Sequence, residues 1–286
     1  MAITHISDTA AWVAMYRALE SERPDALFHD PHARRLAGER GETILETLPK
    51  ARSWGWPMVV RTAVMDEMTE HLVWEERADL VINLAAGLDA RPYRLRLPAE
   101  LHWVEVDFPD VVAYKEEVLQ GESPRCRLER VPLDLGDREA RQSLLERLGA
   151  GARRALVIAE GLLVYLEPDA VEALAADLRA VRAVEWWLID LASPRVLVWM
   201  EKSWGRQVAA GGAPFRFAPA EGTAFFSRLG WREEAYRSMG EEAERLGRTP
   251  WWWPIPKFLG HFTSAKKREE ARRMSGCVLL SVDGER

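Results

Sequence analysis

Apolar side chains recur at helical spacing through the first quarter of the chain. The pattern predicts helices over residues 9–20, 30–40 and 59–68, and Pro24 ends the first of them. From residue 79 onward, short apolar runs alternate with helical segments of the length that parallel crossovers require. The predicted strands are 80–84, 101–106, 126–131, 156–159, 186–191 and a closing strand at 276–282, and the helices between them are 111–120, 138–148 and 168–181.

This alternation predicts an α/β fold with a Rossmann-like, doubly wound and mostly parallel sheet. Between 192 and 262 the regularity breaks at glycines and prolines, which predicts loops and short helices inserted before the last strand. We therefore expect an N-terminal helical lid over residues 1–78. A Rossmann-like core should follow over 79–286, with a substrate-side insertion at about 192–262.

The turn after the first predicted strand holds the most informative chemistry. Gly87 lies in this turn, and Asp107 ends the next strand, which is how such sheets bring backbone and a carboxylate to a nucleoside. A dinucleotide fold would have G-x-G-x-x-G, and no phosphate-binding loop occurs elsewhere. A ribose-containing ligand without phosphate, such as S-adenosylmethionine, fits better than a nicotinamide dinucleotide. The structural alternative is that Gly87 only ends a strand and Asp107 caps a helix.

Further polar positions follow the third, fourth and fifth strands. They are Asp134 with Leu135, Glu160 and Asp190. Because the carboxyl ends of parallel strands meet at one edge of a sheet, we expect all of these residues to line one crevice.

Four blocks in this order resemble the leucine carboxyl methyltransferase-like family of S-adenosylmethionine-dependent class I methyltransferases. The blocks are 83–95, 105–109, 131–135 and 160–166, with the upstream segments 30–33 and 61–62. The resemblance implies a binding role for seven residues. Gly87 would approach the amino-acid portion of the cofactor, Asp107 would bind the ribose, Asp134 and Leu135 the adenine, and Glu160 would lie near the methionine end, with Arg61 and Arg17 on the cofactor carboxylate.

One residue departs from the family pattern. Ala85 stands where many members have glycine, and because alanine disfavours positive φ we expect the turn to differ from the usual one. On the acceptor side, the aromatic residues of the insertion could wall an apolar or aromatic acceptor, and we single out Asp190, Trp199 and Phe215. The alternative is that these rings form a satellite core.

Composition narrows the function further. The chain has 286 residues, a net charge of -6 and a pI near 5.7, which argue against nucleic acid as the main partner. Cys126 and Cys277 match no metal spacing, so we expect no metal and a reduced, cytoplasmic protein. No leader pattern and no apolar run of about 20 residues is present, so no membrane partner is expected.

We therefore expect an S-adenosylmethionine-dependent O-methyltransferase for a small carboxylate or phenolic, polyketide-like acceptor. Methyl transfer needs positioning rather than a catalytic triad, and no catalytic residue is identified. The alternatives are a protein-carboxyl methyltransferase and a non-catalytic cofactor-binding or scaffold protein. The oligomeric state and the acceptor stay open.

Overall fold

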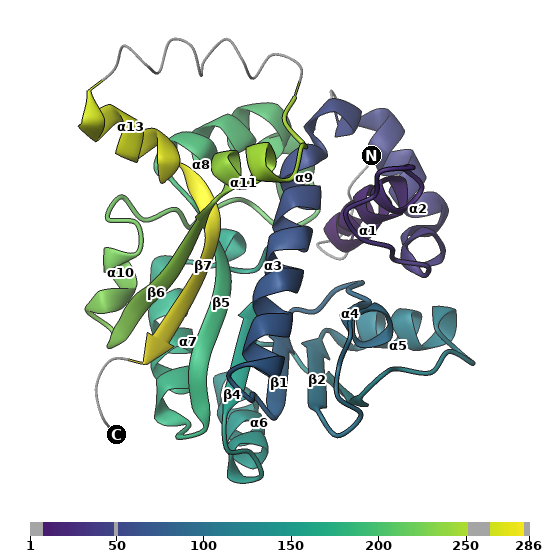
Figure 1. Cartoon of the computed structure of the whole chain (residues 1–286), viewed down its shortest axis with the longest axis vertical. Helices are drawn as coiled ribbons and strands as arrows, with labels where there is room; N and C mark the ends of the chain where they lie inside the picture. Colours follow the sequence, from purple (N-terminus) through teal and green to yellow (C-terminus); the bar gives the residue numbers. More distant parts are fainter. Residues whose placement is uncertain (1–7, 49–50, 251–263, 283–286) are drawn as a thin grey trace.

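The computed structural model describes residues 8–48, 51–250 and 264–282. Within them one seven-stranded sheet has the order β3-β2-β1-β4-β5-β7-β6 (Figure 1). The strands are β1 Leu80–Leu84, β2 His102–Asp107, β3 Arg127–Pro132, β4 Ala155–Ala159, β5 Val184–Ala192, β6 Trp231–Ser238 and β7 Ser275–Val282. The first five are parallel, whereas β7 is antiparallel to both β5 and β6. The expected mostly parallel α/β fold is confirmed.

Helices cover both faces of the sheet. The longer ones are α1 Asp8–Ser21, α2 Ala33–Thr47, α3 Trp56–Trp74, α5 Pro109–Val118, α6 Arg138–Ala150, α7 Pro168–Ala180 and α13 Ala265–Arg272. The shorter ones are η1 Ala51–Trp54, α4 Arg91–Arg94, η2 Leu163–Tyr165, α8 Pro194–Met200, η3 Glu201–Gly205, α9 Arg206–Ala210, α10 Ala224–Ser227 and α11 Met239–Arg245. The three predicted N-terminal helices are all present, with α2 and α3 extending further than the sequence pattern indicated.

Two hydrophobic layers hold these helices on the sheet. One face packs against α3 and α11 through a cluster that includes Trp103 and Cys277. The other face packs against α6, α7 and α10 around Trp187. The central strands β1 and β4 are buried at every position, which is why they are uniformly apolar apart from Asn83.

The N-terminal helices α1 and α2 form a separate layer at one end of the sheet. They lie beside α3 on the side away from β6 and β7 (Figure 1). Their own apolar cluster joins them to the segment around Trp204, Val208 and Phe215. The helical N-terminal region and the insertion therefore meet on the same side of the molecule.

The insertion differs from the expectation in one respect. It contains the strand β6, where the sequence pattern predicted only loops and short helices. This strand lies at the sheet edge, only its end residues Trp231 and Ser238 are buried, and its register shifts between Glu233 and Ala235. Its charged residues are typical of edge strands and leave no apolar alternation in the sequence. The part of the insertion from 251 to 262 lies outside the described residues.

Candidate cofactor and acceptor site

A cavity of about 1070 Å³ opens at the carboxyl ends of β1, β2, β4 and β5. The strand order reverses between β1 and β4, which is where open α/β sheets bind ligands. All ten predicted site residues line this cavity: Arg17, Arg61, Gly87, Asp107, Asp134, Leu135, Glu160, Asp190, Trp199 and Phe215. The volume is at the upper end of the range for small-molecule sites, so it can hold a cofactor and an acceptor together.

The turn after β1 is tied to the end of β2. Asp107 accepts hydrogen bonds from the backbone N–H of Gly87 at 2.6 Å and from that of Phe108 at 2.8 Å. Burial raises the pKa of Asp107, although these two backbone bonds act in the opposite direction. Gly87 has φ +49°, and a Cβ there would lie 3.1 Å from the Cβ of Ala10. The turn therefore needs glycine and presents its backbone to the cavity.

Ala85 overturns one expectation. Its φ is +51°, so it adopts the left-handed conformation that we expected alanine to avoid. The neighbouring backbone explains why, because the N–H of Ala86 donates to the carbonyl of Val106 and fixes the chain directly after Ala85. The turn accepts a strain of about 1–2 kcal/mol at this residue.

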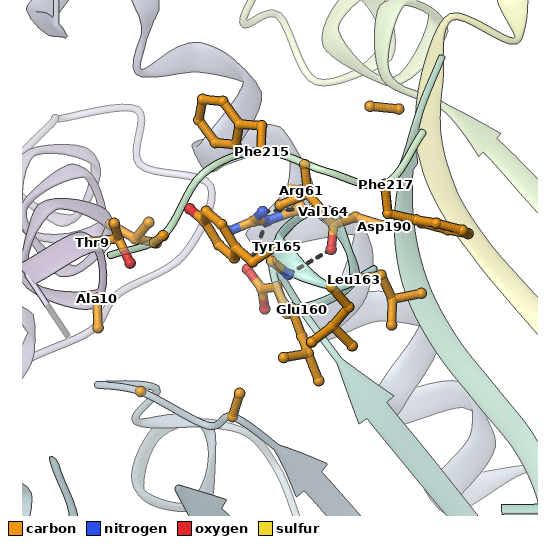
Figure 2. Close-up of a pocket in the computed structure, with 18 of the residues that line it drawn as sticks. Thr9, Ala10, Arg61, Glu160, Leu163, Val164, Tyr165, Asp190, Phe215 and Phe217 are labelled. Carbon is orange, nitrogen blue, oxygen red and sulfur yellow. Dashed lines mark hydrogen bonds and ion pairs between the residues drawn. The ribbon is translucent and has the colours of Figure 1, made fainter. Parts of the chain in front are cut away.

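Arg61 of α3 connects the ends of β4 and β5. Its Nε donates to Glu160 at 2.9 Å and its Nη1 to Asp190 at 3.0 Å, while the N–H of Gly161 donates to Asp190 at 2.6 Å (Figure 2). Burial alone would lower the pKa of Arg61, but the carboxylates of Asp190 and Glu160 outweigh it and raise that pKa. Its Nη2 makes no hydrogen bond to any described residue, so it is available to a ligand carboxylate.

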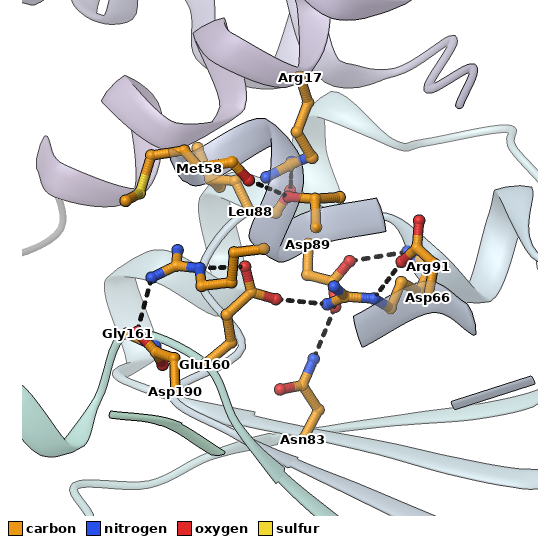
Figure 3. Close-up of polar contacts among 12 residues, drawn as sticks. Arg17, Met58, Asp66, Asn83, Leu88, Asp89, Arg91, Glu160, Gly161 and Asp190 are labelled. Atoms are coloured by element: carbon orange, nitrogen blue, oxygen red, sulfur yellow. Dashed lines mark hydrogen bonds and ion pairs between the residues drawn. The ribbon is translucent and has the colours of Figure 1, made fainter. Parts of the chain in front are cut away.

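Arg91, just after the β1 turn, extends this arrangement. Its Nη1 lies 2.7 Å from Glu160 and 2.7 Å from Asp89, and its Nε lies 2.7 Å from Asp66 (Figure 3). Burial would raise the pKa of Glu160, but Arg91 and Arg61 outweigh it and lower that pKa. Sequence reasoning assigned no role to Arg91, Asp89 or Asp66. The only signal was that Asp89 and Arg91 fall inside the first resemblance block, 83–95.

Arg17 reaches the same turn from α1. Its Nη2 donates to the backbone carbonyl of Leu88 (Figure 3). Its Nε donates to Asp30 at 2.9 Å. Arg94 lies 3.8 Å from the same Asp30 carboxylate. Arg17 therefore lines the cavity while it ties the first helix to the glycine turn.

Asp134 and Leu135 lie at the rim near the end of β3. Asp134 is exposed and accepts a hydrogen bond from the backbone N–H of Gly136 at 2.8 Å. Leu135 is half-buried, and its carbonyl accepts a hydrogen bond from Arg141. The two residues follow β3, the edge strand of the sheet, whereas Arg61 contacts the ends of β4 and β5.

The aromatic residues fall into two groups. A ladder of rings follows the cavity wall, with centroid distances of 5.8 Å for Tyr16–Trp12, 5.4 Å for Trp12–Trp204, 5.0 Å for Trp204–Trp199 and 4.4 Å for Trp199–Trp54. Phe215 stacks on Tyr165 at 5.7 Å beside it (Figure 2).

The second group is ordinary core. Phe226 and Trp231 pack on Trp187 at 5.5 and 5.4 Å, and Phe225 packs on Phe226 at 5.2 Å. The satellite-core interpretation therefore fits these three residues of the insertion. Trp199 and Phe215 line the cavity and also pack in the apolar cluster of the N-terminal helices, so they combine a place in the cavity wall with core packing.

Two further findings concern the described part of the chain. No helix in it is long and apolar enough to cross a membrane. No group of three or more histidine, cysteine, aspartate or glutamate residues in it could hold a metal ion.

The sheet order defines a Rossmann-like α/β protein, and its cavity lies at the topological switch point, where such sheets bind ligands. Two solved structures share this fold: a DUF574 family protein from Streptomyces avermitilis, and a provisionally named methyltransferase from Thermobifida fusca. The first has a TM-score of 0.59 at 12% identity and covers 94% of this chain and 96% of that chain. The second has a TM-score of 0.59 at 15% identity and covers 99% and 97%. At these identities the likeness shows the fold alone.

Sequence comparison gives the family. The leucine carboxyl methyltransferase family profile matches residues 10–179. A Streptomyces coelicolor relative, provisionally named as an S-adenosyl-L-methionine-dependent methyltransferase, is 38% identical over 177 residues, covering 59% of this chain and 62% of that protein. A Frankia alni relative with the same provisional description is 32% identical over 254 residues, covering 84% and 87%. The chain belongs to the leucine carboxyl methyltransferase family of S-adenosylmethionine-dependent methyltransferases.

Proposed function

We propose that this protein transfers a methyl group from S-adenosylmethionine to an oxygen of a small aromatic acceptor. The observation that carries the proposal is the single cavity that joins the glycine turn, the Arg61 cluster and the aromatic ladder. The bound cofactor would supply an electrophilic methyl group on a sulfonium. The protein's own residues bind, orient and exclude water.

The cavity residues fit the parts of this cofactor. Gly87 and the strained Ala85 bring bare backbone to the amino-acid portion, and Asp107 keeps lone pairs for the ribose hydroxyls beyond its two backbone bonds. Arg61 offers its free Nη2 to the carboxylate, and Glu160 lies at the same end. Asp134 and Leu135 lie at the rim, where the adenine would reach. Arg17 acts on the turn through Leu88 and can also face the carboxylate.

The acceptor side favours a carboxylate over a phenol. No histidine or lysine lines the cavity among the described residues, and Glu160 and Asp190 are both ion-paired to arginine. A phenol would need a group to take its proton, whereas a carboxylate is already ionised at neutral pH. The ladder of Trp12, Trp199 and Trp204 gives the acceptor an apolar, aromatic wall.

The N-terminal helices and the insertion have distinct parts in this proposal. The helices of residues 1–78 serve as a lid that supplies Trp12, Tyr16 and Arg17 to the cavity. The insertion at 192–262 supplies Trp199, Trp204 and Phe215 on the acceptor side. A non-catalytic scaffold is not favoured, because the relatives are described as methyltransferases.

The test uses the protein with methyl-labelled S-adenosylmethionine and a panel of aromatic acids, phenols and peptides. Treatment of the products with alkali separates the outcomes, because a methyl ester releases labelled methanol and a methyl ether does not. Alkali-labile label on an aromatic acid supports the proposal. Label in an alkali-stable ether corrects the acceptor to a phenol. Transfer only to peptides, or no transfer by a protein that binds the cofactor, overturns the proposal.

A further inference from the structure

A continuous network of buried ion pairs runs from the first helix to the cavity. In order along the network its members are Arg17, Asp30, Arg94, Asp66, Arg91, Glu160, Arg61 and Asp190, and Asp89 is a further partner of Arg91. Successive N···O separations are between 2.5 and 3.0 Å, apart from 3.8 Å between Arg94 and Asp30. The four arginine side chains are only 2–7% exposed. The network is therefore largely shielded from solvent and salt.

The charges of this network do not balance. Four guanidinium groups face five carboxylates, which leaves one excess negative charge. Side-chain exposure rises from 0% at Asp30 to 15% at Glu160 and 22% at Asp190. The two most accessible carboxylates, Glu160 and Asp190, both pair with Arg61, and Glu160 is shared with Arg91. The excess negative charge thus lies at the cavity end of the network.

Asp190 is held in place at the cavity end of this network. One of its oxygens accepts from Arg61 at 3.0 Å and the other accepts from the N–H of Gly161 at 2.6 Å. Gly161 has φ +65°, and a Cβ there would lie 3.3 Å from Nη1 of Arg61, so the guanidinium packs directly over this glycine. Asp190 therefore fixes the position of Arg61 and adds the fifth negative charge (Figures 2 and 3).

The two cofactor forms differ by one charge in this part of the cavity. The methyl donor S-adenosylmethionine carries a sulfonium, an ammonium and a carboxylate, so its net charge is positive. The thioether product S-adenosylhomocysteine lacks the sulfonium charge and is neutral overall. One excess negative charge in a site of low dielectric constant attracts the positively charged donor and has little net effect on the neutral product. We propose that Asp190, through this excess charge, makes the site bind S-adenosylmethionine in preference to S-adenosylhomocysteine. This inference rests on the cofactor placement in the proposed function.

Calorimetric titration with both compounds tests the inference. We expect Asp190→Asn to weaken donor binding more than product binding, so that the ratio of product Kd to donor Kd falls about tenfold. Glu167→Gln is the matched control: it removes one carboxylate at the cavity rim, where Glu167 is exposed and pairs with Arg216 outside the network. The control should leave the ratio unchanged.

Each outcome has a distinct meaning. A wild-type protein that binds neither compound refutes the proposed function. Equal weakening of both compounds by Asp190→Asn, or the same fall of the ratio in Glu167→Gln, overturns only the charge-selection inference.

A wild-type measurement decides the matter if Asp190→Asn does not fold. The probe is a cofactor analogue with a tertiary amine in place of the sulfonium, titrated on either side of the pKa of that amine. The network should raise the pKa of the bound amine, and an unshifted or lowered pKa refutes the inference.

Discussion

Replacement of Ala85 by glycine should stabilise the protein. The φ of +51° at this residue costs about 1–2 kcal/mol in an L-residue with a Cβ, and glycine removes that cost. Glycine also gains freedom in the unfolded chain, which offsets about 0.4–1 kcal/mol. The net expectation is a gain of about 0.5–1 kcal/mol in the free energy of unfolding, or about 1–4 °C in Tm for a chain of this size.

The neighbouring residue provides a matched control. Ala86→Gly is the same chemical change one position along the turn, but Ala86 has no positive φ and is buried. Without strain to relieve, this variant has the entropic cost of about 0.4–1 kcal/mol and also loses the packing of a buried methyl group, so it should be less stable than the wild type. Thermal and urea unfolding of the two variants beside the wild type measures both changes. We expect a higher free energy of unfolding for Ala85→Gly and a lower one for Ala86→Gly. A less stable Ala85→Gly variant would show that the turn carries no strain at this residue.

Further predictions concern the ribose, acceptor and arginine contacts. Asp107→Ala should weaken S-adenosylmethionine binding by about 1–3 kcal/mol in calorimetry, and unchanged affinity would mean that the ribose lies elsewhere. Because burial raises the pKa of Asp107, wild-type affinity should begin to fall on acidification at a higher pH than an ordinary aspartate would cause, and Asp107→Asn should abolish that limb of the pH profile. Trp199→Ala should raise the acceptor KM about 2- to 10-fold without changing cofactor affinity, whereas the core variant Phe226→Ala should instead lower the free energy of unfolding by about 3–5 kcal/mol. Gly161→Ala should cost about 1–2 kcal/mol of stability and weaken cofactor binding by displacing Arg61, and normal affinity would contradict this contact.

The strands were predictable where burial on both faces makes the sequence uniformly apolar. Residues 80–84 were assigned correctly to β1, and β4 differs from the expected 156–159 by one residue. The edge strand β6 was missed, because its stability comes from pairing with β7 rather than from its own sequence pattern. The conformation of Ala85 was missed for a related reason, since a local preference gave way to hydrogen bonds made by the residues around it.

The site was predictable as a set of positions and not as a set of contacts. Strand ends and the family resemblance predicted eight residues that line one cavity, because a parallel sheet brings its carboxyl ends together, and the aromatic content of the insertion predicted Trp199 and Phe215. Neither indicated that Arg61 binds two carboxylates, or that Arg91 binds three from different parts of the chain. Such pairings depend on side-chain distances in the folded state, which spacing along one sequence does not encode.

The topology explains why the network crosses the site at all. The reversal of strand order between β1 and β4 leaves a crevice at their carboxyl ends. There Glu160, just after β4, pairs with Arg91 from the β1 side and with Arg61 of α3, which also reaches Asp190 of β5. Removing one partner of a buried ion pair costs about 3–5 kcal/mol, because it leaves the other charge uncompensated. The lid, the turn and both strand ends are thus linked through one set of charges. A donor that adds its positive charge there should stabilise the helices of residues 8–48 together with the sheet, and not the cavity wall alone.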